Sequence, residues 1–136
     1  LRDVYKRQGF YQYQCVVPPA AAPDATKALL KAIADARQGS FLGVLKRFGE
    51  RTSQGLLSFH RPGATLALDF PDRGEETLAL FARLDAIVAE AGGRLYPAKD
   101  GRMPADMFRR GFPRWEEVEA QRDPAIMSDF WRRVTR

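Results

Sequence analysis

The segment Gly93-Arg94-Leu95-Tyr96-Pro97-Ala98-Lys99-Asp100-Gly101-Arg102 sets the architecture expected for this chain. A short strand over residues 94–96 follows a helix that ends at two glycines, and Pro97 ends the strand. Charged residues come directly after it. Rigid folds place reactive groups in polar loops at the ends of strands. We therefore expect Tyr96 and Lys99 to line a site on one face of a sheet.

Periodic patterns on the N-terminal side of this segment predict the other elements. In order, the patterns predict strand 10–17, helix 24–37, strand 40–48, strand 65–70, helix 75–91 and strand 94–96. This β-α-β-β-α-β order is that of the split βαβ, ferredoxin-like fold, which is an α+β fold. Each helix has one apolar stripe that needs a sheet face to cover it. We therefore expect an antiparallel four-stranded sheet with two helices on one face.

Beyond residue 103 the apolar pattern is helical but irregular. It predicts helices over residues 104–110 and 114–121, and a last helix that starts at Asp123-Pro124 and has Ile126, Phe130 and Val134 on its apolar side. We divide the chain into a tail over residues 1–8, an α+β domain over 9–103 and a helical extension over 104–136.

The first eight residues match none of these elements. They resemble the translated adapter-like tails found at the ends of assembled environmental sequences, so we interpret them as a non-native or linker tail. Without them the formal net charge falls from +5 to +3, which is unremarkable for a domain of this size and weakens the argument for a nucleic-acid partner. We also expect the chain to begin within a longer protein.

Composition excludes several other classes of protein. No apolar run is as long as a membrane span, and no signal-peptide pattern is present, so we expect a cytoplasmic or membrane-peripheral protein. The single cysteine, Cys15, excludes an internal disulfide framework. We interpret it as a small buried apolar residue and His60 as a loop histidine. Because the two stand far apart in the sequence, we expect no metal site.

Strand alternation gathers polar and aromatic residues on the sheet face away from the helices. They are Gln12, Gln14, Lys46, Phe48, Thr65, Asp69 and Tyr96, with Lys99 just beyond. A sheet face in water is also polar, so a plain solvated face remains an alternative, although amides mixed with aromatic rings favour a binding face. Lys46 and Asp69 both lie among apolar residues, and a cross-strand ion pair between them is the alternative to a role in a site.

Segments that carry a family resemblance are spread from Gly9 to the end of the chain: Gly9-Phe10-Tyr11-Gln12-Tyr13-Gln14, Ser40-Phe41-Leu42-Gly43-Val44-Leu45-Lys46-Arg47-Phe48-Gly49, Leu57-Ser58-Phe59, Pro62-Gly63, Leu68-Asp69-Phe70-Pro71, Gly92 to Asp100, Asp123-Pro124 and Ser128-Asp129 to Arg132-Arg133. In order and spacing, the chain resembles the C-terminal substrate-domain part of FAD-dependent oxidoreductases of the vanillyl-alcohol-oxidase type. Within that family it is most similar to the decaprenylphosphoryl-β-D-ribose oxidase branch.

The resemblance implies a flavoenzyme whose separate N-terminal domain binds FAD. The substrate domain would cover the flavin ring, and an alcohol carbon of a sugar-type substrate would give a hydride to the flavin, from which electrons pass to an acceptor. Gln14, Lys46 and Lys99 fall on positions that line the substrate pocket, with Lys99 nearest the flavin as a catalytic and cofactor-binding residue. Phe48 and Tyr96 look like pocket walls, and Tyr96 also lies on the cofactor side.

Two matters stay open at this stage. Lipid-linked ribose is one candidate substrate, and another sugar or polyol is the alternative. A stand-alone ferredoxin-like binding module, for instance for RNA, is a hypothesis of a different class, because such modules stack bases on sheet-face aromatics such as Phe10 and Phe48. Lys46-Arg47 stands where that hypothesis would want an aromatic run. We favour the enzyme hypothesis, and expect this chain to be inactive without an FAD-binding domain.

Overall fold

A computed structural model describes residues 9–99 and 101–136. The tail over residues 1–8 and Asp100 lie outside the described residues, so our interpretation of the tail stays a prediction.

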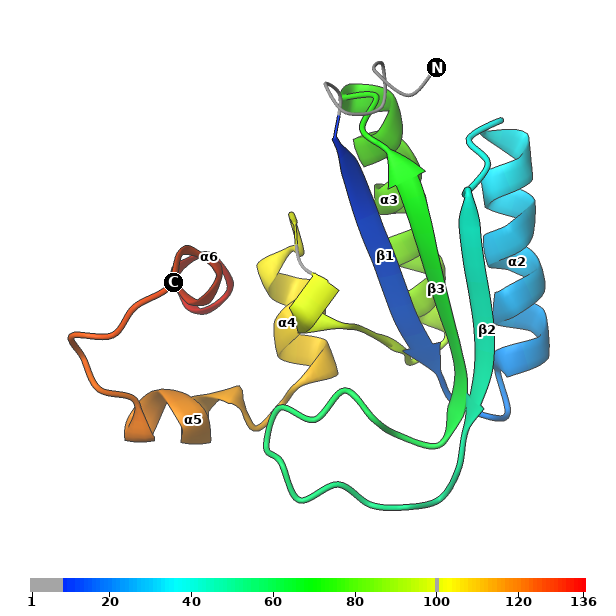
Figure 1. The fold of residues 1–136 in the computed structure, drawn as a ribbon. Coiled ribbons are helices and arrows are strands. Elements are labelled where there is room, and N and C mark those ends of the chain that lie inside the picture. The colour runs from blue at the N-terminus through cyan, green and yellow to red at the C-terminus, as the bar shows by residue number, and fades with distance from the viewer. Residues whose placement is uncertain (1–8, 100) are drawn as a thin grey trace.

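The four strands form one antiparallel sheet, in the order β2-β3-β1-β4 (Figure 1). They are β1 (Phe10–Val17), β2 (Leu42–Phe48), β3 (Gly63–Pro71) and β4 (Arg94–Leu95). β1 pairs with β3 over its whole length, from Phe10 opposite Pro71 to Val17 opposite Ala64. The predicted fold class is confirmed, since this is the strand order of a split βαβ fold.

Two long helices, α2 (Ala22–Asp35) and α3 (Glu75–Glu90), cover the same face of the sheet (Figure 1). The side chains between them and the sheet form the hydrophobic core, which includes Tyr13, Cys15, Leu29, Ile33, Leu66, Leu68, Phe70, Phe81, Leu84 and Val88. These residues alternate along the strands and recur every three or four positions along the helices, as burial on one face requires. Within residues 9–99 and 101–136, no helical layer covers the opposite face of the sheet (Figure 1). We call it the open face.

The chain after β4 forms a 3₁₀ turn, η1 (Pro97–Lys99), and three short helices: α4 (Ala105–Gly111), α5 (Trp115–Gln121) and α6 (Asp129–Thr135). Phe108, on α4, is fully buried and its ring contacts those of Phe112, Phe130 and Trp131. Met107 and Phe108 belong to the same hydrophobic cluster as Tyr13 of the sheet. The division of the sequence at residue 103 therefore stays a prediction.

The predicted start of the last helix is wrong. The Asp123 side chain accepts a hydrogen bond from the backbone N–H of Ala125 and holds a turn there, a local bond that competes with a helix. Helix α6 begins six residues later, where the Ser128 hydroxyl accepts from the N–H of Trp131 as an N-cap. Ile126 is consequently 69% exposed and not on the apolar side of a helix.

Glu119 ties α5 to α6 and gives this extension an expected pH dependence. Its carboxylate accepts hydrogen bonds from Arg122 and from the indole N–H of Trp131, and these lower the pKa of Glu119 from 4.5 to about 2. A carboxyl whose pKa is depressed by folding stabilises the fold above its unfolded pKa, and that stabilisation is lost as the pH falls through the folded value. We expect the indole N–H resonance of Trp131 to titrate near pH 2 and to lose this titration in Glu119→Gln. A midpoint near 4.5 would contradict the prediction.

Candidate functional site

Gln14, Lys46 and Lys99 lie around a single hollow of about 210 Å³ on the open face. The hollow is also lined by Gln12, Leu42, Val44, Thr65, Ala67 and Asp69. Register explains this gathering, because Gln12 lies opposite Asp69, Gln14 opposite Ala67, and Lys46 opposite Thr65. Residues paired in this way point to the same side of a sheet, so three strands each supply side chains to one site.

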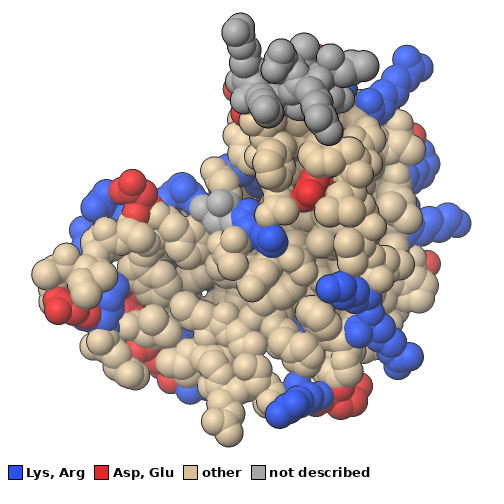
Figure 2. Space-filling view, in the orientation of Figure 1, with Lys and Arg blue, Asp and Glu red and all other residues tan. Residues whose placement is uncertain are grey.

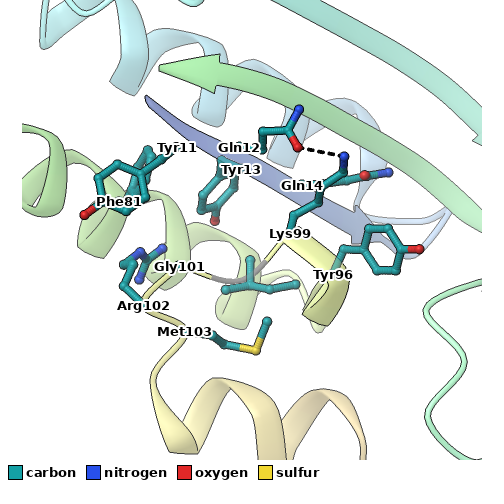
Figure 3. A pocket seen from close by; sticks show the side chains of 11 residues that line it. Tyr11, Gln12, Tyr13, Gln14, Phe81, Tyr96, Lys99, Gly101, Arg102 and Met103 are labelled. Carbon is teal, nitrogen blue, oxygen red and sulfur yellow. Dashed lines mark hydrogen bonds between the residues drawn. The ribbon is translucent and has the colours of Figure 1, made fainter. Parts of the chain in front are cut away.

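Lys99 reaches the open face from η1, not from a strand. The η1 turn is fastened to the sheet where the Tyr96 N–H donates to the Gln14 carbonyl oxygen at 2.9 Å, and the Lys99 N–H donates to the Tyr96 carbonyl oxygen at 3.0 Å. From there the Lys99 ammonium donates to Gln12 Oε1 at 2.8 Å (Figure 3). The sequence predicted a loop at this position. Pro97 ends the strand and begins a helical turn, which carries Lys99 back over β1.

Tyr96 and Lys99 share a second, smaller hollow beside the first (Figure 3). Gln12 and Gln14 line both hollows. The Gln14 amide nitrogen donates to Thr65 Oγ1 at 3.2 Å, which fixes the side chain on the floor of the site. The site therefore combines amide, hydroxyl and ammonium groups with aromatic side chains, among them Tyr96.

A row of aromatic side chains bounds the site, and sequence reasoning missed half of it. The Phe59 ring stacks on Tyr96, with centroids 4.5 Å apart, and contacts Phe48 edge-on at 6.0 Å. The ring of His60 lies 4.8 Å from Phe48. Phe59 is buried although it lies in the loop between β2 and β3. The one signal for it was the apolar Leu57-Ser58-Phe59 piece within a polar loop.

Phe48 holds a different position from the one predicted. It is not among the described residues around either hollow, because Phe59 stands between it and Tyr96. Phe48 contributes to the outer part of the aromatic row. Its role as a pocket wall would depend on how Phe59 is placed when a substrate is present.

The register of β2 and β3 speaks against the alternative of a cross-strand ion pair between Lys46 and Asp69. Asp69 lies opposite Leu42, whereas Lys46 lies opposite Thr65, four residues further along β3. Four residues of a strand span about 13 Å, too far for a pair held by direct opposition. Lys46 is exposed and Asp69 is buried. The hollow therefore has Lys46 toward one end, and toward the other Asp69, which lies opposite Gln12, the hydrogen-bond partner of Lys99.

Cys15 is 1% exposed, and burial raises the pKa of its thiol to about 12. The thiolate is the reactive form, so the folded chain should resist alkylation. We expect iodoacetamide at mildly alkaline pH to leave Cys15 unmodified in the folded chain and to modify it completely in urea. Because the sequence has a single cysteine, intact-mass spectrometry reads the result directly. Rapid alkylation of the folded chain would contradict this.

Charge and metal-binding groups give no competing site in the described part of the chain. Lys and Arg side chains are spread over the visible face and its outline, with acidic groups among them (Figure 2). Residues 9–99 and 101–136 contain no cluster of three His, Cys, Asp or Glu side chains suited to a metal ion. No helix within these ranges is long and apolar enough to cross a bilayer.

Comparison with known proteins bears on what the site does. No family model matches the chain. It is 38% identical over 135 residues to decaprenylphosphoryl-beta-D-ribose oxidase of Mycolicibacterium smegmatis, a match that covers 96% of this chain and 29% of that protein. It is also 35% identical over 132 residues to an uncharacterized protein in the mprA 5' region of Streptomyces coelicolor, covering 93% of this chain and 35% of that protein. The chain thus spans about a third of the length of these relatives. The resemblance predicted from the sequence is confirmed: this chain is homologous, over nearly its whole length, to a segment of decaprenylphosphoryl-beta-D-ribose oxidase.

Proposed function

We propose that this chain is the substrate domain of an FAD-dependent oxidoreductase that oxidises an alcohol carbon of a sugar or sugar-like substrate by hydride transfer to flavin. The observation that carries the proposal is the gathering of Gln14, Lys46 and Lys99 around one hollow on the open face, in a chain 38% identical to an oxidase. An N-terminal FAD-binding domain would lie in polypeptide outside this sequence. The chain alone would be inactive.

The residues of the open face fit the edge of a flavin ring. Lys99 is partly buried, and its hydrogen-bond partner is the neutral amide of Gln12, so no described carboxylate neutralises its ammonium in an ion pair. FAD, when bound, supplies the hydride acceptor. An ammonium at this position would stabilise negative charge on the reduced flavin and polarise the substrate hydroxyl. Tyr96, beside Lys99, would bound the cofactor side.

The remaining side chains suit a substrate with several hydroxyl groups. The amide of Gln14 can donate and accept hydrogen bonds at once, as sugar hydroxyls require, and Lys46 offers a cation at the exposed edge of the site. Phe48 and Tyr96 would flank the apolar part of the substrate. The relative's name gives a lipid-linked ribose as its substrate, so we propose a sugar-type substrate, lipid-linked or free, and a separate electron acceptor. Both a cytoplasmic and a membrane-peripheral location are compatible with this proposal.

A visible absorption spectrum of the complete gene product tests the proposal. We expect the spectrum of bound FAD, and bleaching of its oxidised band when decaprenylphosphoryl-β-D-ribose, or a panel of free pentoses and polyols, is added without oxygen. The 136-residue chain is the matched control and should show no flavin band. A full-length protein that is colourless and does not retain added FAD would overturn the proposal.

The RNA-binding alternative names two rings, and the structure leaves them in different surroundings. Phe10 is 58% exposed and meets Phe41 edge-on, whereas the Phe48 ring is in contact with Phe59 and His60. We expect no RNA binding by the chain even at low salt, where such binding is strongest.

A further inference from the structure

The segment that carries Lys99 passes around the edge of β1 from one face of the sheet to the other. β4 pairs only with Cys15 and Val16 of β1, and the residues after it continue along the edge that β4 leaves uncovered. Lys99 reaches Gln12 on the open face, whereas Arg102 reaches the helix-covered face (Figure 3). We call residues 97–99 and 101–103 the strap.

The strap fits tightly against β1 at the point where it changes face. A Cβ atom added at Gly101 would lie 2.9 Å from Cδ1 of Tyr11, closer than such atoms ever approach. A side chain at this position would require the Tyr11 ring or the strap to shift. The position of Lys99 is therefore coupled to whatever holds the strap on the other side.

An ion pair between the buried carboxylate of Asp85 and the partly buried guanidinium of Arg102 holds it there. Arg102 donates from Nη1 to Asp85 Oδ2 at 2.5 Å and from Nη2 to Asp85 Oδ1 at 2.9 Å. The Tyr13 hydroxyl donates to Asp85 Oδ1 at 3.0 Å. Asp85 is 6% exposed, on the core side of α3, and the Arg102 guanidinium lies 4.9 Å from the centroid of the Phe81 ring. We call Tyr13, Asp85 and Arg102 the triad.

A gain in folding stability alone does not explain why the chain contains such a triad. Removing a carboxylate and a guanidinium from water is costly, and replacing a buried ion pair with apolar side chains of similar volume is often neutral or stabilising. A bidentate pair does fix geometry more sharply than an apolar contact does. Tyr13 also lies between Gln12 and Gln14 in β1, so the triad is fastened to the strand that forms the floor of the site.

We propose that Asp85 and Arg102 are positioning residues for Lys99. By fastening the strap to α3 and β1 on the helix-covered face, they hold the Lys99 ammonium over Gln12 on the open face. The catalytic reason for holding Lys99 rests on the proposed function. That Asp85 and Arg102 hold Lys99 in place can be tested on this chain alone. Removing the triad should therefore release Lys99 while the core remains folded.

Competitive acylation of lysines in the 136-residue chain measures how freely the Lys99 amine can be reached. The hydrogen bond to Gln12 holds and shields the Lys99 nitrogen, whereas acylation needs an amine that the reagent can reach. The readout is the labelling rate of Lys99 relative to exposed Lys27, determined by peptide mass spectrometry. A purely structural role of the triad would change unfolding but not this ratio.

Two variants decide the outcome. In Tyr13→Phe/Asp85→Leu/Arg102→Met, which replaces the triad with apolar side chains, we expect a folded chain whose Lys99-to-Lys27 ratio rises roughly threefold or more, as expected for loss of a hydrogen bond to a charged group. Arg102→Lys keeps the positive charge but cannot make both hydrogen bonds to Asp85, so it should also raise the ratio. Arg114→Met removes an exposed ion pair with Glu117 and should leave the ratio unchanged.

A folded triple variant with the wild-type ratio would overturn the proposal. If the triple variant does not fold, the test rests on Arg102→Lys. A wild-type labelling ratio in that variant would also overturn the proposal. Since the assay uses neither flavin nor substrate, its failure is distinct from a failure of the proposed function.

Discussion

Replacing Lys99 with alanine in the complete enzyme is expected to lower the rate of substrate oxidation by about two or more orders of magnitude. The reason is positional, since Lys99 supplies the ammonium that η1 holds over the open face, with the neutral Gln12 amide as its partner. A charge in that place acts on negative charge that develops during hydride transfer, where its effect is largest. The measurement is the rate of flavin reduction in a single turnover without oxygen.

Lys27→Ala is the matched control, because Lys27 is an exposed lysine on α2, on the other side of the sheet. It should reduce flavin at the wild-type rate. Thermal unfolding of both variants should match that of the wild type, since Lys99 lies in no buried ion pair. A near-normal rate in Lys99→Ala would show that Lys99 is an ordinary surface residue.

Phe81→Ala should have the largest effect on folding, a loss of about 3–5 kcal/mol in the free energy of unfolding. Phe81 is 2% exposed, and its ring contacts those of Tyr11, Tyr13 and Phe70. Truncation would leave a cavity between α3 and two strands and would remove the ring beneath Arg102. Urea-induced unfolding followed by circular dichroism measures the change.

Ile126→Ala provides the comparison within the same chain. Ile126 is 69% exposed, so its truncation should alter the free energy of unfolding by no more than about 0.5 kcal/mol. The two substitutions together test the core and the corrected start of α6. A loss below about 1 kcal/mol in Phe81→Ala would mean that the packing around this ring is wrong.

Elements with a clear period could be predicted from the sequence. The aromatic and β-branched run over residues 10–17 matches β1 at both ends, because strand alternation is a local property of the chain. The sheet order followed from the sequence of elements, since a split βαβ unit leaves few ways to pair four strands. Apart from the start of α6, helix bounds were shifted by one or two residues, for example at α2, which begins at Ala22 rather than Asp24.

Features that depend on contacts between distant residues could not be predicted. The register that separates Lys46 from Asp69 is set by the pairing of β2 with β3 and leaves no mark on either segment alone. Phe59 lies in a loop without periodicity, and the Asx turn at Asp123 overrode an apolar helical pattern. The triad joins residues 72 and 17 positions apart.

The sequence pointed to the polar residues of the candidate site but not to all of the aromatic residues beside it, such as Phe59. Alternation placed Gln14 and Lys46 on one face, and the charged loop at the end of the fourth strand indicated Lys99, which no periodic pattern reaches because it lies in a 3₁₀ turn. The family resemblance then gave all three residues a role. The structure brings these three together around one hollow. Their roles as substrate-binding and catalytic groups stay predictions.

A crystal structure of the complete, FAD-loaded polypeptide tests the central claim most directly. We predict that the flavin ring faces the side of the sheet that carries Gln14 and Lys46, with its edge within hydrogen-bonding reach of the Lys99 ammonium. A flavin ring bound against α2 and α3, or far from Lys99, would contradict the account.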